Sequence, residues 1–255
     1  MRIAVLMTCY NRYEVTRRCL VRLFESVLKD GIDYDVWLVD AASPDRTGNR
    51  IKKEFARVNL ICCEGLYWCR GMHLAWRSAR TAYDYDYYLW LNDDVLLNGD
   101  ALVTAVNDAD EKDNRVIVCG ELTEDGTRGS KVTYGLGTEG AMSGNFVLVP
   151  RYVFDKLGYI YAGYRHAYGD YDYAIQARKR GIEVVKCSVV VGACRRDPSR
   201  YSRLDGKSLL RRIPLLWDVK GYNLHDGVLF KYRRAGIWGA LASCLHILWI
   251  VIRGR

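Results

Sequence analysis

The chain lacks the marks of several large classes of protein. Only four of its 255 residues are proline, and no Gly/Ser-rich linker divides it. It contains neither a GxGxxG nor a GxxxxGK[ST] motif, which argues against a dinucleotide-dependent enzyme and a P-loop NTPase. No segment has the polar, aromatic-poor composition of a disordered region. Because half of the residues are hydrophobic and 27% are charged, these absences leave a folded globular protein.

Cysteine is present but not in metal-binding or redox spacing. None of the nine cysteines forms a CxxC pair, so a zinc or redox site is not expected. The apolar run over residues 1–7 is too short for a signal peptide and is better explained as a first buried strand. An odd number of cysteines without a signal peptide is typical of reduced thiols in the cytoplasm. We therefore expect the cysteines to be small buried apolar side chains.

Positive charge is concentrated towards the C-terminus. The formal net charge is +8, and arginine and lysine are frequent from residue 195 onwards. An almost uncharged segment, 235–252, lies among these charges, which favours contact with a membrane surface over contact with DNA. At about 1.5 Å per residue it is just long enough to cross a thin hydrocarbon layer. We prefer a helix that lies in the membrane interface. The alternatives are a helix that spans the membrane and a helix that packs on this domain or on a partner.

The first half of the chain alternates apolar runs with helical patterns. The apolar runs predict strands at 2–9, 34–39, 58–62, 87–91 and 116–119. Helical spacing predicts helices at 13–29, 47–56, 71–83 and 99–110. This alternation indicates an α/β fold with a mainly parallel sheet flanked by helices, in which ligands bind beyond the carboxyl ends of the strands.

The second half is less regular. It predicts strands at 141–149 and 183–191, helices at 151–157 and 169–180, and a basic loop with a helix at 195–212. We divide the chain into a catalytic domain, residues 1–205, and a basic and apolar helical extension, residues 206–255.

Acidic residues follow the predicted strand 87–91. Asn92, Asp93 and Asp94 come directly after this apolar run, where burying two carboxylates without a partner would be costly. Mg²⁺ and Mn²⁺ prefer oxygen ligands and leave positions for phosphate oxygens. The turn is either a divalent metal site or a solvated cap.

Two further carboxylates open the predicted helix 169–180. Asp170 and Asp172 lie at its start, where acidic side chains cap helices. A carboxylate projecting from this position into a cleft can also act as a general base. Both interpretations stay open on the residues alone.

Two other strand ends carry polar groups. Asp40 ends the second predicted strand, where a carboxylate can bind a ribose hydroxyl or a base edge. A turn over residues 65–72 follows the third strand, and its Arg70 can reach a diphosphate. Its Trp68 suits packing better than ligand stacking.

Together these segments resemble the family 2 glycosyltransferases of the GT-A fold, especially bacterial rhamnosyltransferase-like members. The resemblance covers about residues 1–195 and rests on the order and spacing of its pieces. Those pieces are Thr8-Cys9-Tyr10-Asn11-Arg12, Val39-Asp40-Ala41-Ala42-Ser43, Trp68 to Met72, Leu91-Asn92-Asp93-Asp94, Ser143 to Pro150, and Gly169-Asp170-Tyr171-Asp172-Tyr173 through Gly181.

The resemblance implies a role for each candidate residue. Asp170 matches the catalytic base of the family, with Asp172 second. Asp94, assisted by Asn92, stands at the metal-binding DxD motif, with Mg²⁺ or Mn²⁺ as the expected cofactor. Contacts with the donor nucleotide, its diphosphate or its sugar are implied for Thr8, Tyr10, Arg12, Asp40, Trp68, Arg70 and Asp93. The sequence departs from the family at Asn92, where an acid is usual, and at Gly169, where many members have Glu.

The implied activity is metal-dependent, inverting transfer of a hexosyl or rhamnosyl group from a UDP- or dTDP-sugar. The expected acceptor is a lipid-linked glycan at the cytoplasmic face of the membrane. A non-catalytic nucleotide-binding module is the main alternative. A sugar-phosphate nucleotidyltransferase is disfavoured because residues 8–12 are not a Gly-rich loop. A nucleic-acid binder is disfavoured because no recognition helix is apparent. His225 is expected to be a plain surface residue rather than a metal or phosphate contact.

Overall fold

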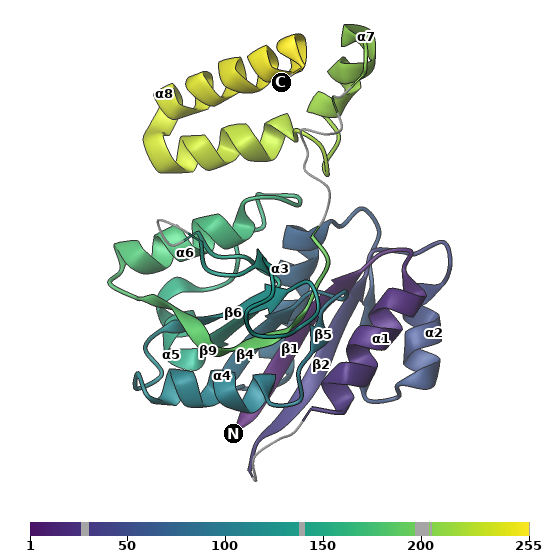
Figure 1. The fold of residues 1–255 in the computed structure, drawn as a ribbon, viewed down its shortest axis with the longest axis vertical. Helices are drawn as coiled ribbons and strands as arrows, with labels where there is room; N and C mark the ends of the chain where they lie inside the picture. Colours follow the sequence, from purple (N-terminus) through teal and green to yellow (C-terminus); the bar gives the residue numbers. More distant parts are fainter. Residues whose placement is uncertain (27–30, 138–140, 197–203, 205, 255) are drawn as a thin grey trace.

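A computed structural model describes residues 1–26, 31–137, 141–196, 204 and 206–254. Among these residues one sheet runs in the order β3-β2-β1-β4-β8-β6-β9-β5, and β7 pairs with β6 (Figure 1). Its strands are β1 (Arg2–Cys9), β2 (Asp33–Asp40), β3 (Val58–Cys62), β4 (Tyr87–Leu91), β5 (Leu96–Leu97), β6 (Ile117–Thr123), β7 (Val132–Tyr134), β8 (Phe146–Pro150) and β9 (Val184–Ala193).

The first four strands form the parallel part of the sheet. β1 lies between β2 and β4 and is parallel to both, and β2 is parallel to β3. Residues 3–7 of β1 are completely buried, as expected for a strand that helices cover on both faces. The connecting helices are α1 (Tyr13–Phe24), α2 (Thr47–Glu54) and α3 (Trp68–Ala82). The carboxyl ends of β1, β2 and β4 therefore meet at one edge.

The second half of the sheet is mixed. β8 is antiparallel to both β4 and β6, whereas β6 and β9 are parallel. Helices α4 (Ala101–Asp110), α5 (Arg151–Leu157) and α6 (Gly169–Lys179) accompany these strands. The start of β8 and the start of α6 are thereby brought to the edge where β4 ends.

Two hydrophobic clusters form the core of this domain. One gathers the buried side chains of α1 and α4 against the sheet, and the other gathers those of α3, α5 and α6. The second is rich in aromatic rings, with Trp76 in contact with Tyr88, Trp90, Phe154 and Tyr173. All nine cysteines are free, and six of them are buried, as expected. The expectation fails for Cys62, whose side chain is exposed.

The C-terminal extension is a separate helical layer. It contains α7 (Leu209–Arg212), a short 3₁₀ helix η3 (Ile213–Leu216) and α8 (Leu224–Arg253). α8 is broken at Ala235 and Gly236, whose backbone is non-helical, and it doubles back into two arms (Figure 1). A third hydrophobic cluster joins the arms to η3 through Leu216, Tyr222, Ile247, Ile250 and Val251.

The α/β fold class expected from the sequence is confirmed, with parallel pairing concentrated in β1 to β4. Several element predictions differ from the structure: the strand expected at 141–149 begins only at Phe146, and the helix expected at 13–29 ends at Phe24. The short strands β5 and β7 were not expected, α3 begins at Trp68 rather than Gly71, and the C-terminal helix starts eleven residues before 235. Residues 27–29 of the expected first helix, and residues 197–203 and 205 of the expected basic loop, lie outside the described residues.

Candidate active site

A cavity of about 880 Å³ opens at the carboxyl ends of β1, β2 and β4. This is the edge at which open α/β sheets bind ligands, and the volume suits a small-molecule site. The following residues line it: Thr8, Cys9, Tyr10, Arg12, Val39, Ala41, Ala42, Glu64, Gly65, Leu66, Tyr67, Trp68, Asn92, Asp93, Asp94, Tyr134, Gly144, Asn145, His166, Ala167, Tyr168, Asp170, Tyr171 and Lys220.

The acidic turn after β4 forms part of the cavity wall. Asp93 is 4% exposed, and its carboxylate accepts hydrogen bonds from Arg12 Nη1 at 3.0 Å and Thr16 Oγ1 at 2.9 Å. Burial raises the pKa of Asp93 to about 7, although the Arg12 cation opposes this shift. Asp94 is more exposed and lies 3.5 Å from Arg12 Nη2. Arg12 therefore bridges both carboxylates of the turn.

Trp68 connects this turn to the neighbouring wall. Its indole Nε1 donates a hydrogen bond of 2.7 Å to Asn92 Oδ1, and its ring meets that of Trp90 edge-on. A Cβ added to Gly144 would lie 2.6 Å from the Trp68 ring, so only glycine fits beside it. Trp68 thus packs in the wall and also faces the cavity.

Asp170 faces the cavity from the start of α6. Its Oδ2 accepts a hydrogen bond of 2.9 Å from the Gly144 amide, and its Oδ1 accepts one from the Tyr171 amide. Burial raises the pKa of Asp170 to about 6, against the lowering effect of these two amides. The carboxyl group is therefore poised to exchange a proton near neutrality.

Thr8 and Tyr10 lie at the end of β1, on the cavity wall, as expected. Tyr10 is 55% exposed, so its ring is free to contact a ligand. Asp40 does not line the cavity. Its carboxylate is 3% exposed and accepts hydrogen bonds from the amides of Ser43 and Gly48. It shapes the loop after β2, whose Ala41 and Ala42 line the cavity instead.

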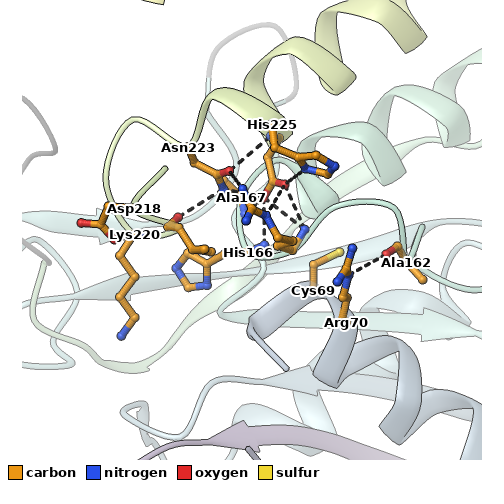
Figure 2. A network of polar contacts seen from close by, with 12 residues as sticks. Cys69, Arg70, Ala162, His166, Ala167, Asp218, Lys220, Asn223 and His225 are labelled. Carbon is orange, nitrogen blue, oxygen red and sulfur yellow. Dashed lines mark hydrogen bonds and ion pairs between the residues drawn. The ribbon is translucent and has the colours of Figure 1, made fainter. Parts of the chain in front are cut away.

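Arg70 and Asp172 also lie outside the lining. Arg70 is on the first turn of α3, and its Nε donates to the carbonyl of Ala162 at 3.2 Å (Figure 2). Asp172 is 5% exposed and pairs with Arg233 of α8 at 3.1 Å. Both side chains therefore make contacts within the protein, and the diphosphate contact at Arg70 and the second base at Asp172 stay predictions.

Sequence reasoning missed several titratable residues of the lining, among them Glu64, His166 and Lys220. His166 belongs to the loop before α6, and Lys220 belongs to the C-terminal extension (Figure 2). The Lys220 ammonium brings positive charge to a cavity whose other cation, Arg12, is bound to Asp93 and Asp94. Nothing in the sequence near Lys220 marks it as a site residue. His225 does not line the cavity; its Nδ1 lies 2.8 Å from Asp226 Oδ1.

Solved structures share this fold at low sequence identity. Residues 1–349 of S. aureus TarS, in complex with UDP-GlcNAc, are 13% identical, with a TM-score of 0.60 over 100% of this chain and 81% of that one. The mannosyltransferase PcManGT from Pyrobaculum calidifontis, in complex with GDP-Man and Mn²⁺, is 18% identical, with a TM-score of 0.54 over 100% and 76%. Longer S. aureus TarS is 16% identical, with a TM-score of 0.57 over 85% of this chain; the match spans 40% of its length.

Comparison with sequence families gives a direct assignment. No curated protein matches the chain significantly. The profile described as "Glycosyl transferase family 2" matches residues 4–136, which is more than half of the chain and includes β1 to β4 with the acidic turn. The chain therefore belongs to glycosyl transferase family 2.

Proposed function

We propose that the chain transfers a hexosyl or rhamnosyl group from a UDP- or dTDP-sugar to a hydroxyl of a growing, lipid-linked glycan, with inversion at the anomeric carbon. The observation that carries this proposal is a single cavity lined by both the acidic turn, Asn92 to Asp94, and the carboxyl of Asp170. The UDP-GlcNAc and GDP-Man complexes of structural neighbours support a nucleotide-sugar donor.

The donor would lie along the ends of β1 and β2. Thr8, Tyr10 and the loop that Asp40 shapes would hold the nucleoside, and Trp68 would border the sugar. Asp93, neutralised by Arg12, keeps the turn in place beside the ribose or sugar. Lys220 supplies the positive charge that diphosphate oxygens need, in place of Arg70.

The acidic turn also fits a divalent cation. Asp94 offers a partly exposed carboxylate, and Asn92, whose Oδ1 accepts the Trp68 bond, lines the same cavity. Among the described residues no group of three or more His, Cys, Asp and Glu side chains is gathered for a metal. Mg²⁺ and Mn²⁺ need only one or two protein oxygens when phosphates supply the rest. A bound cation would neutralise charge on the leaving diphosphate.

Asp170 would act as the general base. It accepts the proton of the acceptor hydroxyl while that oxygen forms a bond to the anomeric carbon and the carbon–oxygen bond to the diphosphate breaks. This single in-line displacement inverts the anomeric configuration and needs no covalent enzyme intermediate. The transition state has oxocarbenium character, as in glycoside hydrolysis.

Donor turnover tests the proposal directly. We expect release of UDP or dTDP from one nucleotide sugar in a panel, dependent on Mg²⁺ or Mn²⁺ and abolished by a chelator. Asp94→Ala should lose this turnover, whereas Asp155→Ala, an exposed carboxylate on α5, should keep it. The panel is run with and without a lipid-linked glycan acceptor. Nucleotide binding without turnover would identify a non-catalytic module, and absence of both would refute the proposal.

We also propose that the extension attaches the enzyme to the cytoplasmic face of a membrane. Among the described residues, α8 is long and apolar enough to cross a bilayer, but its break at Ala235 and Gly236 favours an interfacial position. The second arm presents an exposed apolar stripe at helical spacing, and basic side chains flank it. The stripe consists of Trp238, Leu241, Leu245, Trp249 and Ile252.

Substitutions in this stripe test the attachment. We expect Trp238→Ser, Leu245→Ser and Trp249→Ser together to reduce co-sedimentation with anionic phosphatidylglycerol vesicles at least tenfold, because buried apolar area drives such binding. Removing residues 236–255 should also release the protein, but it would delete Ile247, Ile250 and Val251 and so expose Leu216 and Tyr222, which pack against them. Tyr152→Ser, an exposed aromatic on α5, is the control. Unchanged sedimentation of the triple variant would contradict a membrane role for this face.

A further inference from the structure

Asp226 is a completely buried carboxylate in the first turn of α8. Its two oxygens accept hydrogen bonds from three consecutive backbone amides, those of Arg165, His166 and Ala167, at 2.9–3.2 Å. The Asn223 amide group donates a further bond to it at 2.6 Å. The three backbone amides lie 59–61 residues away in the sequence, so these bonds join the extension to the catalytic domain.

The geometry identifies a carboxylate held in an anion-binding concavity. Successive backbone N–H groups that point to one centre bind anions, and the ionised oxygen makes each bond stronger than a neutral one. Burial alone would raise the pKa of Asp226, but the amides of His166 and Arg165 lower it below its ordinary value. Asp226 is therefore charged at neutral pH, and the loop 165–167 is organised around it.

The same loop connects two walls of the cavity. The carbonyl of Arg165 accepts a hydrogen bond of 3.2 Å from the amide of Cys69, which follows Trp68 in α3. His166 and Ala167 line the cavity themselves. Tyr168 follows in the left-handed region at φ +68°, a conformation that a non-glycine residue keeps only when its surroundings enforce it.

The turn at Tyr168 then delivers Asp170 to the cavity. The Asp172 amide bonds to the Tyr168 carbonyl at 2.8 Å and starts α6, so the orientation of this turn fixes the first residues of the helix. A second link acts in the same direction, because Arg233 of α8 pairs with Asp172. If α8 moved away from the loop, both the bonds from the 165–167 amides to Asp226 and the Arg233–Asp172 ion pair would be lost.

We propose that Asp226 is a positioning residue for the transfer reaction: by binding the 165–167 amides it holds the loop that places Asp170 against the donor site. The extension would then be required for catalysis in addition to membrane attachment. This inference rests on the proposed function, since Asp170 is taken as the base. Asp226 touches neither donor nor acceptor and acts only through the loop.

Asp226→Asn keeps the size of the side chain but removes its charge and turns an NH₂ group towards donors. We expect kcat for sugar transfer to fall at least tenfold, while the Kd for UDP or dTDP changes less than threefold and binding stoichiometry stays at one. The acid limb of the pH dependence of kcat should move by half a pH unit or more, because Asp170 shifts relative to the Gly144 amide. A merely structural role would lower the active fraction without moving this limb.

Asp125→Asn is the matched control, because Asp125 also accepts backbone and hydroxyl bonds in a loop but lies outside the cavity lining. Hydrogen exchange at the 165–168 amides should accelerate at least tenfold in Asp226→Asn only. If this variant does not fold, Asn223→Ser, which removes one donor to Asp226, should give the same changes in smaller measure. Wild-type kcat with unchanged exchange in a folded variant would overturn the inference. A wild type that turns over no donor would instead refute the proposed function, and exchange would still decide whether Asp226 orders the loop.

Discussion

Replacing Asp170 with asparagine is expected to lower kcat for sugar transfer by about 10²- to 10⁴-fold, the range for loss of a general base. The amide has nearly the same shape and can still accept a bond from the Gly144 amide, but it cannot take the acceptor proton. Nucleotide affinity should change little, because Asp170 lies on α6 and not at the ends of β1 and β2, where we propose that the nucleoside binds. Single-turnover transfer and calorimetric titration with UDP or dTDP separate these two quantities.

The pH dependence gives an independent check on the same residue. The base must be ionised to act, so activity should rise with pH through about 6, the raised pKa of Asp170. The raised pKa also makes the stability of the fold depend on pH. Because burial favours the protonated carboxyl in the folded state, Asp170 contributes most to the free energy of unfolding below the ordinary pKa of an aspartate, and this contribution is lost as pH rises through about 6. In Asp170→Asn both the residual activity and this part of the stability profile should be flat.

Asp172→Asn distinguishes the two carboxylates of α6. Asp172 pairs with Arg233 rather than facing the cavity, so its loss should lower kcat less than tenfold and leave the acid limb at about pH 6. The reverse ranking of the two variants would show that the base has been assigned to the wrong residue.

The sequence predicted the parallel half of the fold well because its signals are local. β1 and β4 are buried on both faces, and such strands appear as uninterrupted apolar runs. The polar residues that end them then fall at one edge of the sheet by topology alone. This is why Thr8, Tyr10, Arg12 and the acidic turn, which the sequence singled out, lie together on the cavity wall.

Local geometry explains why two predicted site residues, Arg70 and Asp172, lie outside the cavity lining. α3 begins at Trp68 rather than Gly71, so Arg70 is on the first helical turn and points to Ala162 instead of occupying a loop beside the ligand. Asp172 follows Asp170 by two helical positions, or about 200° around the axis, which directs the two side chains to different neighbours. Neither outcome can be read from residue type.

The contribution of the extension was beyond the reach of sequence patterns. Lys220 and Asp226 lie in a segment without a recognisable motif, and their partners are distant in the chain. The near absence of charge in 235–252 indicated an apolar helix, but not that the helix begins at Leu224, breaks at Gly236 and returns over itself. These features depend on packing between residues that are distant in the chain, and such contacts cannot be inferred from the local patterns of a single sequence.

Gly144 offers the sharpest test that the walls of the cavity work as one unit. The segment 143–150 contributed to the family resemblance without a role for any of its residues. In the structure the Gly144 amide binds Asp170, and its missing side chain leaves room for the Trp68 ring. An added methyl group would lie 2.6 Å from that ring, too close for any real contact, and 3.3 Å from Asp170 Cβ, a tight contact that requires a small shift.

Gly144→Ala should therefore displace Trp68 from Asn92 and Asp170 from the amide together. We expect kcat to fall about 100-fold, the effect of a 1 Å misplacement of reacting groups, with a loss of stability of about 1–3 kcal/mol from overpacking. Gly135→Ala is the control, because its Cβ would meet Glu121 at an ordinary 3.5 Å. Tryptophan fluorescence and single-turnover transfer should change in Gly144→Ala alone. Full activity in this variant would mean that Trp68 and Asp170 adjust independently, and the wall would then be a set of separate contacts.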